Sequence, residues 1–527
     1  MNKKLEQTKS IWMQSGDITS PGPLSKNVVT DVCVVGAGIA GMTTAYLLLC
    51  EGKSVVVLDD GPIGGGQTQR TTAHLTNAID DRYIHIESWH GKEGARMAAE
   101  SHTAAIDRIE AIAKQENIEC EFERLDGYLV GSLGESLEIL QQELLAVRRA
   151  GLSQVELMPH CPVFELSSEP CLRFPNQGQF HPIKYLTGLK QAVQRMGGLI
   201  FTKSRVEKIE CGPPAMVHTY SGTVVTAHSV VVATNSPFND LVTIHTKQAA
   251  YISYVLGFEV PKGSVKRALV WDTENPYHYV RLQALPESES SGELLIVGGE
   301  DHKTGQANDA EERYRRIEEW TRTRFPTSGK ILYRWSGQVL ETIDGLAFIG
   351  RNPLDGPNVY IATGDSGQGM THGTIAGMLL TDLIVERQNP WSTLYDPARK
   401  TLRAAGRYVQ ENLNVAAQYT TWVTAGDVDS TQSIAPGTGA IVRAGLSKVA
   451  AYRDENGGLH QCSAVCPHLG GLVEWNRNES TWDCPCHGSR FDKNGHLLIG
   501  PANSDLETIP VPFEDGVVGV VGVVGVD

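Results

Sequence analysis

The sequence lacks any uninterrupted run of eighteen apolar residues, and its first ten residues, MNKKLEQTKS, contain no apolar signal region. It also lacks an excess of positive charge, because 46 Lys and Arg stand against 61 Asp and Glu, a net charge of −15. Nucleic acids and anionic membranes bind basic surfaces, so the composition argues against both partners. We expect a soluble, cytoplasmic protein without a transmembrane segment.

A disulfide framework is absent as well. Six of the ten cysteines are scattered without framework spacing, as reduced and mostly buried thiols are. These six are Cys33, Cys50, Cys120, Cys161, Cys171 and Cys211. The other four, Cys462, Cys466, Cys484 and Cys486, fall within twenty-five residues of one another. In a cytosolic chain such clustering indicates a metal site.

The stretch from Asp31 to Asp59 predicts a βαβ dinucleotide-binding unit. An apolar strand leads into Gly36, Gly38 and Gly41, which form G-x-G-x-x-G, and a helical segment and a second apolar strand follow. These glycines permit a tight turn, close approach of the backbone to a pyrophosphate, and packing of helix on strand. The helix N-terminus offers free N–H groups to the phosphates, and Asp59 is placed to accept a hydrogen bond from a ribose hydroxyl.

The chain has only one such motif, although its 527 residues are enough for two or three domains. If the bound dinucleotide is a flavin, its reduction by a pyridine nucleotide would need a second site of this kind. In that case we expect an organic substrate to supply the electrons that reduce it.

Three further segments fit around a flavin. Gly64 to Gly66 form a second glycine-rich loop, followed by hydroxyl and amide side chains. Residues 250–299 are rich in strand signals with interleaved aromatic residues, which suits an antiparallel sheet over a ligand cavity, although any single ring is as well explained as core. The strand Val359 to Thr363 leads through a glycine-rich turn into an apolar helix, and N–H groups around Gly369 to Thr371 would stabilise negative charge on a reduced flavin.

Over its first 400 residues the chain resembles the D-amino-acid-oxidase-like superfamily of FAD proteins. Besides the residues above, the resemblance rests on four short motifs: GGGQT at Gly64–Thr68, HPIKYL at His181–Leu186, ATNSP at Ala233–Pro237 and GQGMT at Gly367–Thr371. It implies an α/β FAD-binding, Rossmann-like domain plus an antiparallel-sheet substrate domain. The implied reaction is oxidation of a C–N bond by hydride transfer to FAD.

The resemblance also implies site residues. The FAD contacts would be Gly36, Gly38, Gly41, Asp59, Gly66, Thr68, Asp365, Gly369, Met370 and Thr371. For the substrate the candidates are Tyr251, Tyr279, Arg281 and His302, with Arg281 a partner for a substrate carboxylate. For each of these four, a structural role in a strand is the simpler alternative.

Two details concern the oxidative half of the reaction. Relatives of the sarcosine-oxidase type carry a lysine on a strand that faces the flavin, whereas Leu294 to Gly299 contains none and Lys303 follows only later. This difference favours a dehydrogenase over an oxidase. His74 is a candidate covalent anchor for the flavin, although a histidine that merely lines its loop is the more common case.

The C-terminal cysteines resemble a Rieske motif. Cys466-Pro-His468 and Cys484-Pro-Cys-His487 give C-x-H and C-x-x-H, and the resemblance implies that Cys466 and Cys484 bind one iron of a [2Fe-2S] cluster and that His468 and His487 bind the other. The alternative is a Cys₂His₂ zinc site, but the loops that follow match the Rieske pattern and not the spacing of a zinc finger.

Two positions depart from high-potential Rieske proteins. These have a second cysteine, disulfide-paired with the equivalent of Cys486, where this chain has Gly471, and a tyrosine where it has Phe491. With fewer dipoles to stabilise the reduced cluster, the potential is expected near the low end of the Rieske range of about −150 to +300 mV. Cys462 could pair with Cys486 instead, but a cytosolic setting argues against it.

The expected domain organisation has four parts. Residues 1–27 form a lead-in, 28–412 the FAD-dependent oxidoreductase, 413–437 a linker and 438–527 a small all-β Rieske domain. Within the oxidoreductase the nucleotide-binding parts are about 28–115, 181–240 and 330–395, and the substrate domain comes from the segments between them.

The sequence thus predicts an enzyme that oxidises a small amine or amino acid with FAD and passes electrons through a Rieske [2Fe-2S] cluster to an external one-electron acceptor. One alternative is an electron-transfer or redox-sensing protein without amine turnover. Another is a flavin monooxygenase that uses the cluster as its electron input.

Overall fold

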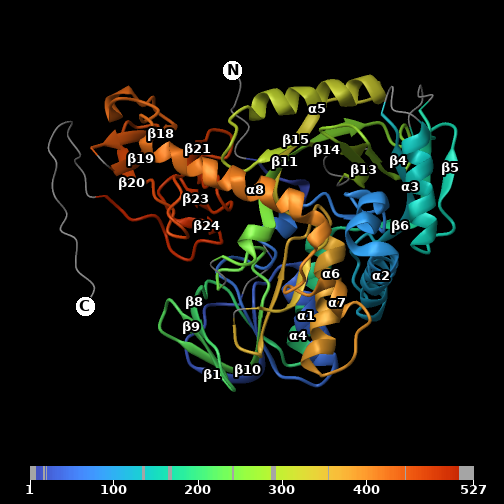
Figure 1. Ribbon diagram of the computed structural model, residues 1–527, viewed down its shortest axis with the longest axis horizontal. Coiled ribbons are helices and arrows are strands. Elements are labelled where there is room, and N and C mark those ends of the chain that lie inside the picture. Colours follow the sequence, from blue (N-terminus) through green and yellow to red (C-terminus); the bar gives the residue numbers. More distant parts are fainter. Residues whose placement is uncertain are drawn as a thin grey trace. The chain divides into compact units, whose positions relative to one another are not determined.

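The computed structural model divides the chain into two compact units (Figure 1). The first contains residues 1–302 and 309–409, and the second contains 303–308 and 410–527. The structure describes residues 8–15, 18, 21–132, 137–163, 169–239, 242–285, 292–353, 355–445 and 447–509. Parts of the predicted lead-in and of the predicted Rieske domain, residues 1–7 and 510–527 among them, lie outside the described residues.

The first unit contains an eight-stranded sheet whose central strands are parallel. The order β16-β17-β10-β1-β2-β7 places β1 between β10 and β2, and the hairpin β8-β9 extends it from β10. The strands are β1 (Val28–Val35), β2 (Val55–Leu58), β7 (Leu199–Phe201), β8 (Val206–Glu210), β9 (Ala215–Thr219), β10 (Val224–Val232), β16 (Phe348–Arg351) and β17 (Val359–Thr363). Their valine-rich runs are buried on both faces, as parallel strands require.

Two helices of this domain pack on each other with almost no side chain between them. They are α1 (Ile39–Cys50) and α6 (Gly369–Ile384). A Cβ atom on Gly373 would lie 2.7 Å from a side-chain carbon of Ile39, and one on Gly377 would lie 2.6 Å from a side-chain carbon of Thr43. Glycine at both positions is therefore what lets the helices approach.

A nine-stranded, mainly antiparallel sheet forms the rest of the first unit's framework. Its order is β15-β11-β14-β13-β12-β4-β6-β3, with β5 beside β6. The strands are β3 (His74–Leu75), β4 (Glu123–Val130), β5 (Glu156–Met158), β6 (Cys171–Gln179), β11 (Gln248–Val260), β12 (Leu269–Asp272), β13 (His278–Ala284), β14 (Glu293–Lys303) and β15 (Ile331–Thr342). Side chains alternate between its two faces, and Ile252, Tyr254 and Leu256 of β11 pack in one core with Tyr314 of α5 (Ala310–Arg324).

Longer helices complete the unit. They are α2 (Arg82–Gln115), α3 (Leu137–Arg149) and α4 (Pro182–Arg195). The non-helical backbone of Gly91, with φ of 74°, divides α2 into two pieces. No helix within the described residues is long and apolar enough to cross a membrane.

The second unit is built from two small antiparallel sheets. One has the order β18-β19-β20, from β18 (Thr438–Ala444), β19 (Ser447–Arg453) and β20 (Leu459–Ser463). The other has the order β21-β22-β23-β24, from β21 (Glu474–Asn476), β22 (Thr481–Asp483), β23 (Arg490–Asp492) and β24 (Leu497–Ile499). Trp475, Trp482 and Phe491 fill a shared core with the clustered cysteines. The predicted all-β domain is confirmed.

Two predicted boundaries differ from the structure. The helix α8 (Ala405–Gln418) continues past the predicted linker start at 413, and Val428 of the predicted linker pairs with Val442 of β18. The strand β15, placed by sequence in the nucleotide-binding part from 330, belongs to the antiparallel sheet, because its twelve residues pair along β11. Periodicity shows that β15 is a strand but carries no information on which sheet it joins.

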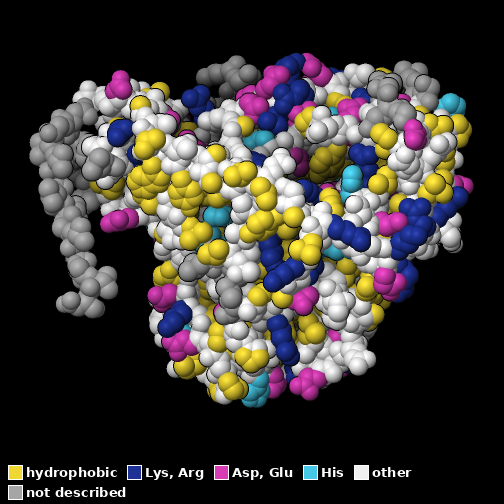
Figure 2. Space-filling view, in the orientation of Figure 1, with side chains coloured by type: hydrophobic (Ala, Val, Ile, Leu, Met, Phe, Trp, Pro, Cys, Tyr) yellow, Lys and Arg dark blue, Asp and Glu magenta, His cyan; other side chains and the backbone are white. Residues whose placement is uncertain are grey.

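The helix α8 is unusual in burying none of its side chains. Hydrophobic side chains gather along it in Figure 2, and Val409 and Leu413 are 54% and 66% exposed. The division between the two units falls inside this helix, after Val409. It therefore contributes connection rather than core.

Candidate functional site

The glycine-rich turn after β1 brings backbone against backbone. Gly36 has φ of +107°, and a Cβ atom there would lie 2.4 Å from the carbonyl oxygen of Ala233. A Cβ atom on Gly41 would lie 1.9 Å from the carbonyl oxygen of Gly36. Only glycine satisfies both contacts, and the turn leaves the N-terminus of α1 at the carboxyl ends of the parallel strands. This is where α/β sheets bind dinucleotides.

Asp59 lies at the end of β2, as the sequence predicts. One carboxylate oxygen accepts a hydrogen bond from the backbone N–H of Ala37 at 2.6 Å, and the other accepts from Gly61 at 2.8 Å. Burial, together with the neighbouring Asp60, raises the pKa of Asp59 to about 7. Each oxygen keeps a second lone pair, so a ribose hydroxyl would still find an acceptor here.

The second predicted loop lies beside this turn. The Thr68 hydroxyl accepts a hydrogen bond from the backbone N–H of Ile39 at 3.2 Å. A Cβ atom on Gly66 would meet nothing within 4 Å, so the loop has open space at that residue. The Thr68 hydroxyl therefore binds a backbone N–H group at the N-terminus of α1, and Gly66 leaves room for a ligand.

The N-terminus of α6 has no side-chain cap. Its Ncap residue, Gln368, makes no capping hydrogen bond, and the Thr371 hydroxyl donates to the Gln368 carbonyl instead of facing outward. The backbone N–H groups of Gly369, Met370 and Thr371 are thus available at the positive end of the helix dipole. Two uncapped or weakly capped helix ends on one sheet edge suit the pyrophosphate and the pyrimidine edge of FAD.

Two of the predicted substrate residues lie on strands of the antiparallel sheet, and side-chain alternation directs them away from α5. Tyr251 of β11 is opposite Val339 of β15. The ring of Tyr279 lies over Gly298, where a Cβ atom would be 2.4 Å from it, and its hydroxyl shares a hydrogen bond of 2.7 Å with Ser253. Glycine at 298 therefore makes the place for the Tyr279 ring.

Arg281 has a different environment from the one expected of a carboxylate-binding residue. It is fully buried, and its Nη1 donates to the backbone carbonyl oxygens of Thr72, Ala73 and Phe180 at 2.9 to 3.2 Å. Its Nη2 donates to Gln283. Burial lowers its pKa to about 9. These contacts favour a role in holding the loop around Ala73 over a role in binding substrate.

The two predicted histidines also have partners within the protein. His302 hydrogen-bonds with the Tyr254 hydroxyl at 2.9 Å, on the face of the sheet that packs against α5. His74 donates from Nε2 to the Val280 carbonyl oxygen at 3.2 Å and accepts at Nδ1 from the Thr72 hydroxyl at 3.1 Å. A covalent flavin bond at either nitrogen of His74 would replace one of these hydrogen bonds.

The sequence reasoning missed a group of carboxyl side chains. Asp80, Asp301 and Glu341, which were not predicted, lie near the predicted Asp365, and each belongs to a different segment of the chain. Asp80 contacts Gly367 and Asp365 contacts Gly369, both at the turn into α6. The only sequence signal was the presence of acidic residues at strand ends or in loops, which is common on solvated surfaces.

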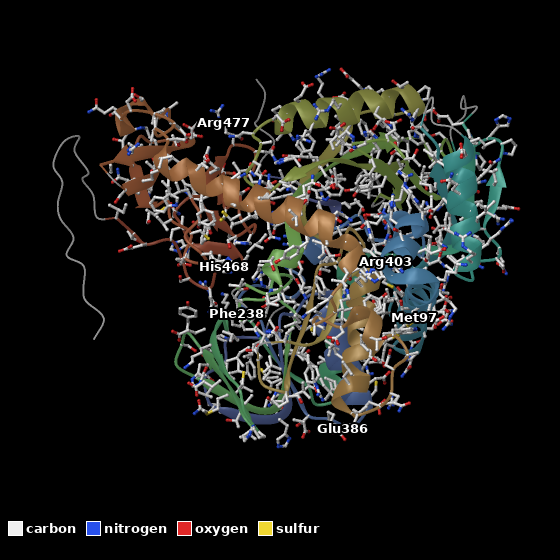
Figure 3. The ribbon with its side chains drawn as sticks, viewed as in Figure 1. Met97, Phe238, Glu386, Arg403, His468 and Arg477 are labelled. Carbon is white, nitrogen blue, oxygen red and sulfur yellow. The ribbon has the colours of Figure 1, made fainter. Side chains whose placement is uncertain are left out.

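In the second unit the four predicted cluster ligands come together on two loops. Cys466 and Cys484 are buried with their sulfur atoms in hydrogen-bonding contact, while the rings of His468 and His487 lie 4.9 Å apart. Both histidines keep partial exposure, and Figure 3 shows His468 at the edge of this unit. Buried thiols on one side and partly exposed imidazoles on the other match the ligand arrangement of a Rieske cluster.

Hydrogen bonds to sulfur support the same assignment. Cys466 receives hydrogen bonds from the backbone of His468 and from the Ser489 hydroxyl, and Cys484 receives one from the backbone of Cys486. Such donors hold thiolates and stabilise the reduced cluster. The loop contacts that surround them, such as Cys466 N–H to the Gly471 carbonyl at 2.8 Å, keep the ligands in place.

The departures from high-potential Rieske proteins have a clear place in the structure. A Cβ atom on Gly471 would lie 2.6 Å from the sulfur of Cys486, so a cysteine at this position would face Cys486 directly. None of the ten cysteines, all of which lie among the described residues, forms a disulfide. Cys462 bonds instead to the Ala450 carbonyl oxygen at 3.7 Å, within β19 and β20.

Comparison with known proteins covers both units. Residues 31–383 match the family described as FAD dependent oxidoreductase, and residues 422–510 match the Rieske [2Fe-2S] domain. The Rieske 2Fe-2S iron-sulfur protein YhfW of Bacillus subtilis is 31% identical over 96% of this chain and 98% of its own length. The gamma-glutamylputrescine oxidoreductase of Escherichia coli is 29% identical over 76% of this chain and 95% of its own length.

Solved structures show the same fold at lower identity. Glycine oxidase from Geobacillus kaustophilus is 16% identical, with a TM-score of 0.58, over 71% of this chain and 99% of that chain. L-amino acid deaminase from Proteus vulgaris is 16% identical, with a TM-score of 0.59, over 73% of this chain and 100% of that chain. These structures show the fold alone. The family matches establish FAD and a Rieske [2Fe-2S] cluster as the cofactors, and the donor sets described above fit both.

Replacing Gly36 tests the flavin cradle. We expect Gly36→Val to lose most of its bound FAD, because the side chain would meet the Ala233 carbonyl oxygen and force the turn away from the α1 N-terminus. Flavin and iron content of the purified protein measure this, and the iron content should stay unchanged. Gly406→Ala is the control, because a Cβ atom there meets nothing within 4 Å. Full flavin content in Gly36→Val would contradict the assignment.

Replacing Ser489 tests the sulfur hydrogen bonds. Ser489→Ala removes the O–H donor to Cys466, so the reduced cluster loses stabilisation and its potential should fall by roughly tens of millivolts. Spectroscopic redox titration of the cluster measures the shift. Ser463→Ala, whose hydroxyl accepts only from the Val465 N–H at 3.2 Å, should leave the potential unchanged. An equal shift in both variants would show that the hydrogen bond to Cys466 is not the cause.

Proposed function

The chain belongs to the FAD-dependent oxidoreductase family and carries a Rieske [2Fe-2S] domain, and on this basis we propose that it oxidises the C–N bond of a small amine or amino acid and delivers the electrons, through the cluster, to an external one-electron acceptor. The observation that carries the proposal is the presence of both redox groups in one chain. FAD takes two electrons from an organic substrate at once, whereas a Rieske cluster carries one.

The substrate side of the reaction is a dehydrogenation. The amine first gives up the proton of its ammonium group, because a lone pair on nitrogen must assist the departure of hydride from the neighbouring carbon. FAD, held at the turn of Gly36 and at the N-terminus of α6, would accept hydride from this carbon. The iminium left behind would be hydrolysed by water to a carbonyl compound and ammonium. Both electrons leave with the hydride, so the outside acceptor must be reduced twice, by one electron each time.

The family relatives support an amine or amino acid as substrate. The Escherichia coli relative is named for oxidation of gamma-glutamylputrescine, and the structural relatives are named for glycine and L-amino acids. On the face of β14 that lies away from α5, Leu294, Ile296 and Gly298 offer no lysine, which supports a dehydrogenase. Lys303, the nearest lysine that follows, forms an ion pair of 2.6 Å with Glu411, and both residues belong to the second unit.

The second unit supports delivery to an external acceptor. Cys466 and Cys484 are buried, so electrons would leave on the side of His468 and His487, which are partly exposed. Electron transfer needs close approach, and the histidine edge is the part of the cluster site that a partner can reach. We propose that the acceptor meets the protein there.

A panel of amines and amino acids tests the reaction under anaerobic conditions. We expect flavin absorbance to bleach with the substrate class that the protein uses, and the cluster spectrum to change afterwards at a rate independent of protein concentration. If no member of the panel bleaches the flavin, the proposed oxidation is wrong. If the flavin bleaches and the cluster stays oxidised, the proposed electron route is wrong.

A variant of a predicted iron-sulfur cluster ligand separates reduction of the flavin by substrate from transfer of electrons to the acceptor. Cys484→Ser should lose the cluster and keep flavin reduction by substrate within about threefold, since its defect lies in the electron-exit step, while reduction of an added one-electron acceptor falls at least about tenfold. Cys462→Ser is the matched control, because Cys462 is buried in the same core but is not a predicted ligand. Undiminished acceptor reduction by Cys484→Ser would remove the cluster from the route.

A further inference from the structure

Four carboxyl groups of the first unit are brought together at the turn into α6. We call Asp80, Asp301, Glu341 and Asp365 the carboxylate cluster. Asp80 interacts with Asp301 and Asp365, and Glu341 interacts with Asp80 and Asp301. The group therefore joins the loop before α2, the ends of β14 and β15, and the turn that leads to the uncapped α6 N-terminus.

The cluster lacks matching positive charge. Among the described residues no ion pair joins a Lys, Arg or His to any of its four members. The nearest cations are already engaged: Arg407 contacts Asp81 at 3.2 Å, and Arg313 contacts Asp309 at 2.8 Å and donates to the backbone carbonyl of Asp301. The Gln368 amide, 3.5 Å from an Asp80 oxygen, is a neutral and distant donor.

Two oxygen atoms of the cluster have no hydrogen-bond donor. Within the part of the chain that the structure describes, Oδ1 of Asp301 and Oδ1 of Asp365 are each enclosed without a hydrogen-bond partner. The Asp301 carboxyl group also hydrogen-bonds with Ser253, and its other oxygen accepts a long hydrogen bond of 3.4 Å from the Tyr277 hydroxyl. A buried carboxyl oxygen without a donor costs about 1–3 kcal/mol or more, so the protein would be stabilised by a ligand that supplies N–H groups.

Although those two oxygen atoms are enclosed, none of the four residues is fully buried. Asp80 is exposed, and Asp301, Glu341 and Asp365 retain partial exposure. At the same time, partial removal of the carboxyl groups from water and their mutual repulsion raise the pKa of Asp80 to about 7 and that of Asp301 to about 6, and they raise the pKa of Glu341 well above its ordinary value. Asp80 and Asp301 would thus take up or release a proton readily near neutral pH.

Aromatic rings accompany the carboxyl groups. The rings of Tyr277 and Tyr279 lie 5.8 Å apart, and Tyr279 shares its sheet face with Tyr251. Burial and the negative charges of Asp301 and Asp80 raise the pKa of the Tyr277 and Tyr279 hydroxyl groups. The face of an aromatic ring attracts ammonium groups, so rings and carboxylates favour the same kind of ligand.

From this arrangement we infer that the substrate is a small diamine or polyamine, held by the carboxylate cluster through a second ammonium group while the first is oxidised. The inference rests on the proposed function. One carboxylate of the cluster takes the proton from the ammonium group that reacts. The remaining carboxylates hold the second ammonium group, which stays protonated throughout.

A substrate with its own carboxylate fits this site poorly. Like charges repel, and Arg281, the residue that the sequence suggested for a substrate carboxylate, gives its N–H groups to Thr72, Ala73 and Phe180. A monoamine would neutralise one carboxylate and leave the others without a cation. A second positive charge distinguishes the expected substrate both from a substrate that carries a carboxylate and from a monoamine.

Three compounds of matched length test the inference in the intact holoprotein. They are 1,4-diaminobutane, n-butylamine and 4-aminobutanoate, which differ at the far end by an ammonium, a methyl and a carboxylate group. We expect the diamine to reduce the flavin at a half-saturating concentration roughly tenfold or more below that of n-butylamine, with 4-aminobutanoate the weakest. Homologous diamines and spermidine extend the series.

The outcomes separate the two proposals. Preference for n-butylamine, 4-aminobutanoate or an α-amino acid would overturn the diamine inference while the oxidoreductase function stands. If no amine reduces the flavin, the proposed function fails and this inference fails with it. If several diamines are preferred over their monoamine counterparts, the inference holds and the series identifies the length.

Conservative variants locate the effect. Glu341→Gln and Asp301→Asn should raise the half-saturating concentration of the diamine roughly tenfold and that of n-butylamine less than about threefold, with flavin and iron content unchanged. Glu318→Gln, which removes the same charge from the exposed face of α5, is the control and should change neither. Equal increases in the half-saturating concentrations of the diamine and of n-butylamine would show that the carboxylate cluster does not bind the second ammonium group.

Discussion

Contact between backbones fixes the position of both helix ends at the flavin site. The turn of Gly36 rests on the carbonyl of Ala233, and α6 meets α1 through Gly373 and Gly377, where any side chain would collide. Each of these contacts is short-ranged and leaves no freedom to slide. As a result the N-termini of α1 and α6 end at one edge of one parallel sheet, where their partial positive charges act on the same ligand.

What the sequence predicted well was local. Gly36 to Gly41 and the pairs Cys466–His468 and Cys484–His487 each lie within a few residues, so their spacing alone carries the chemistry of a phosphate turn and of a metal centre. The strands of both sheets were also predictable from their apolar pattern. Sheet membership was not, as β15 shows, because pairing partners are distant in sequence and any strand of suitable length satisfies the pattern.

Charged residues were the least predictable part of the site. Arg281 looked like a partner for a ligand, yet backbone carbonyls take its donors, and a sequence does not distinguish these two fates. The reverse holds for Asp80, Asp301 and Glu341, which looked like ordinary surface acids. Asp301 follows Gly299 and Glu300, both with positive φ, and this irregular end of β14 determines where its carboxyl group lies. Irregular backbone of this kind leaves a weak signal in a sequence.

The carboxyl groups near α6 also bear on the energetics of electron flow. A flavin gains negative charge when it is reduced, so nearby carboxylates would make reduction harder and lower its potential, whereas the α6 N-terminus and a cationic substrate would oppose this effect. Once the cationic product leaves, the negative charge of the carboxylates would favour loss of electrons from the reduced flavin. The cluster in the second unit lacks the disulfide and tyrosine of high-potential Rieske proteins, with Gly471 and Phe491 in their places. Transfer from flavin to cluster is downhill only where the flavin potential lies below that of the cluster, so a lowered flavin potential would suit an acceptor with the expected low Rieske potential.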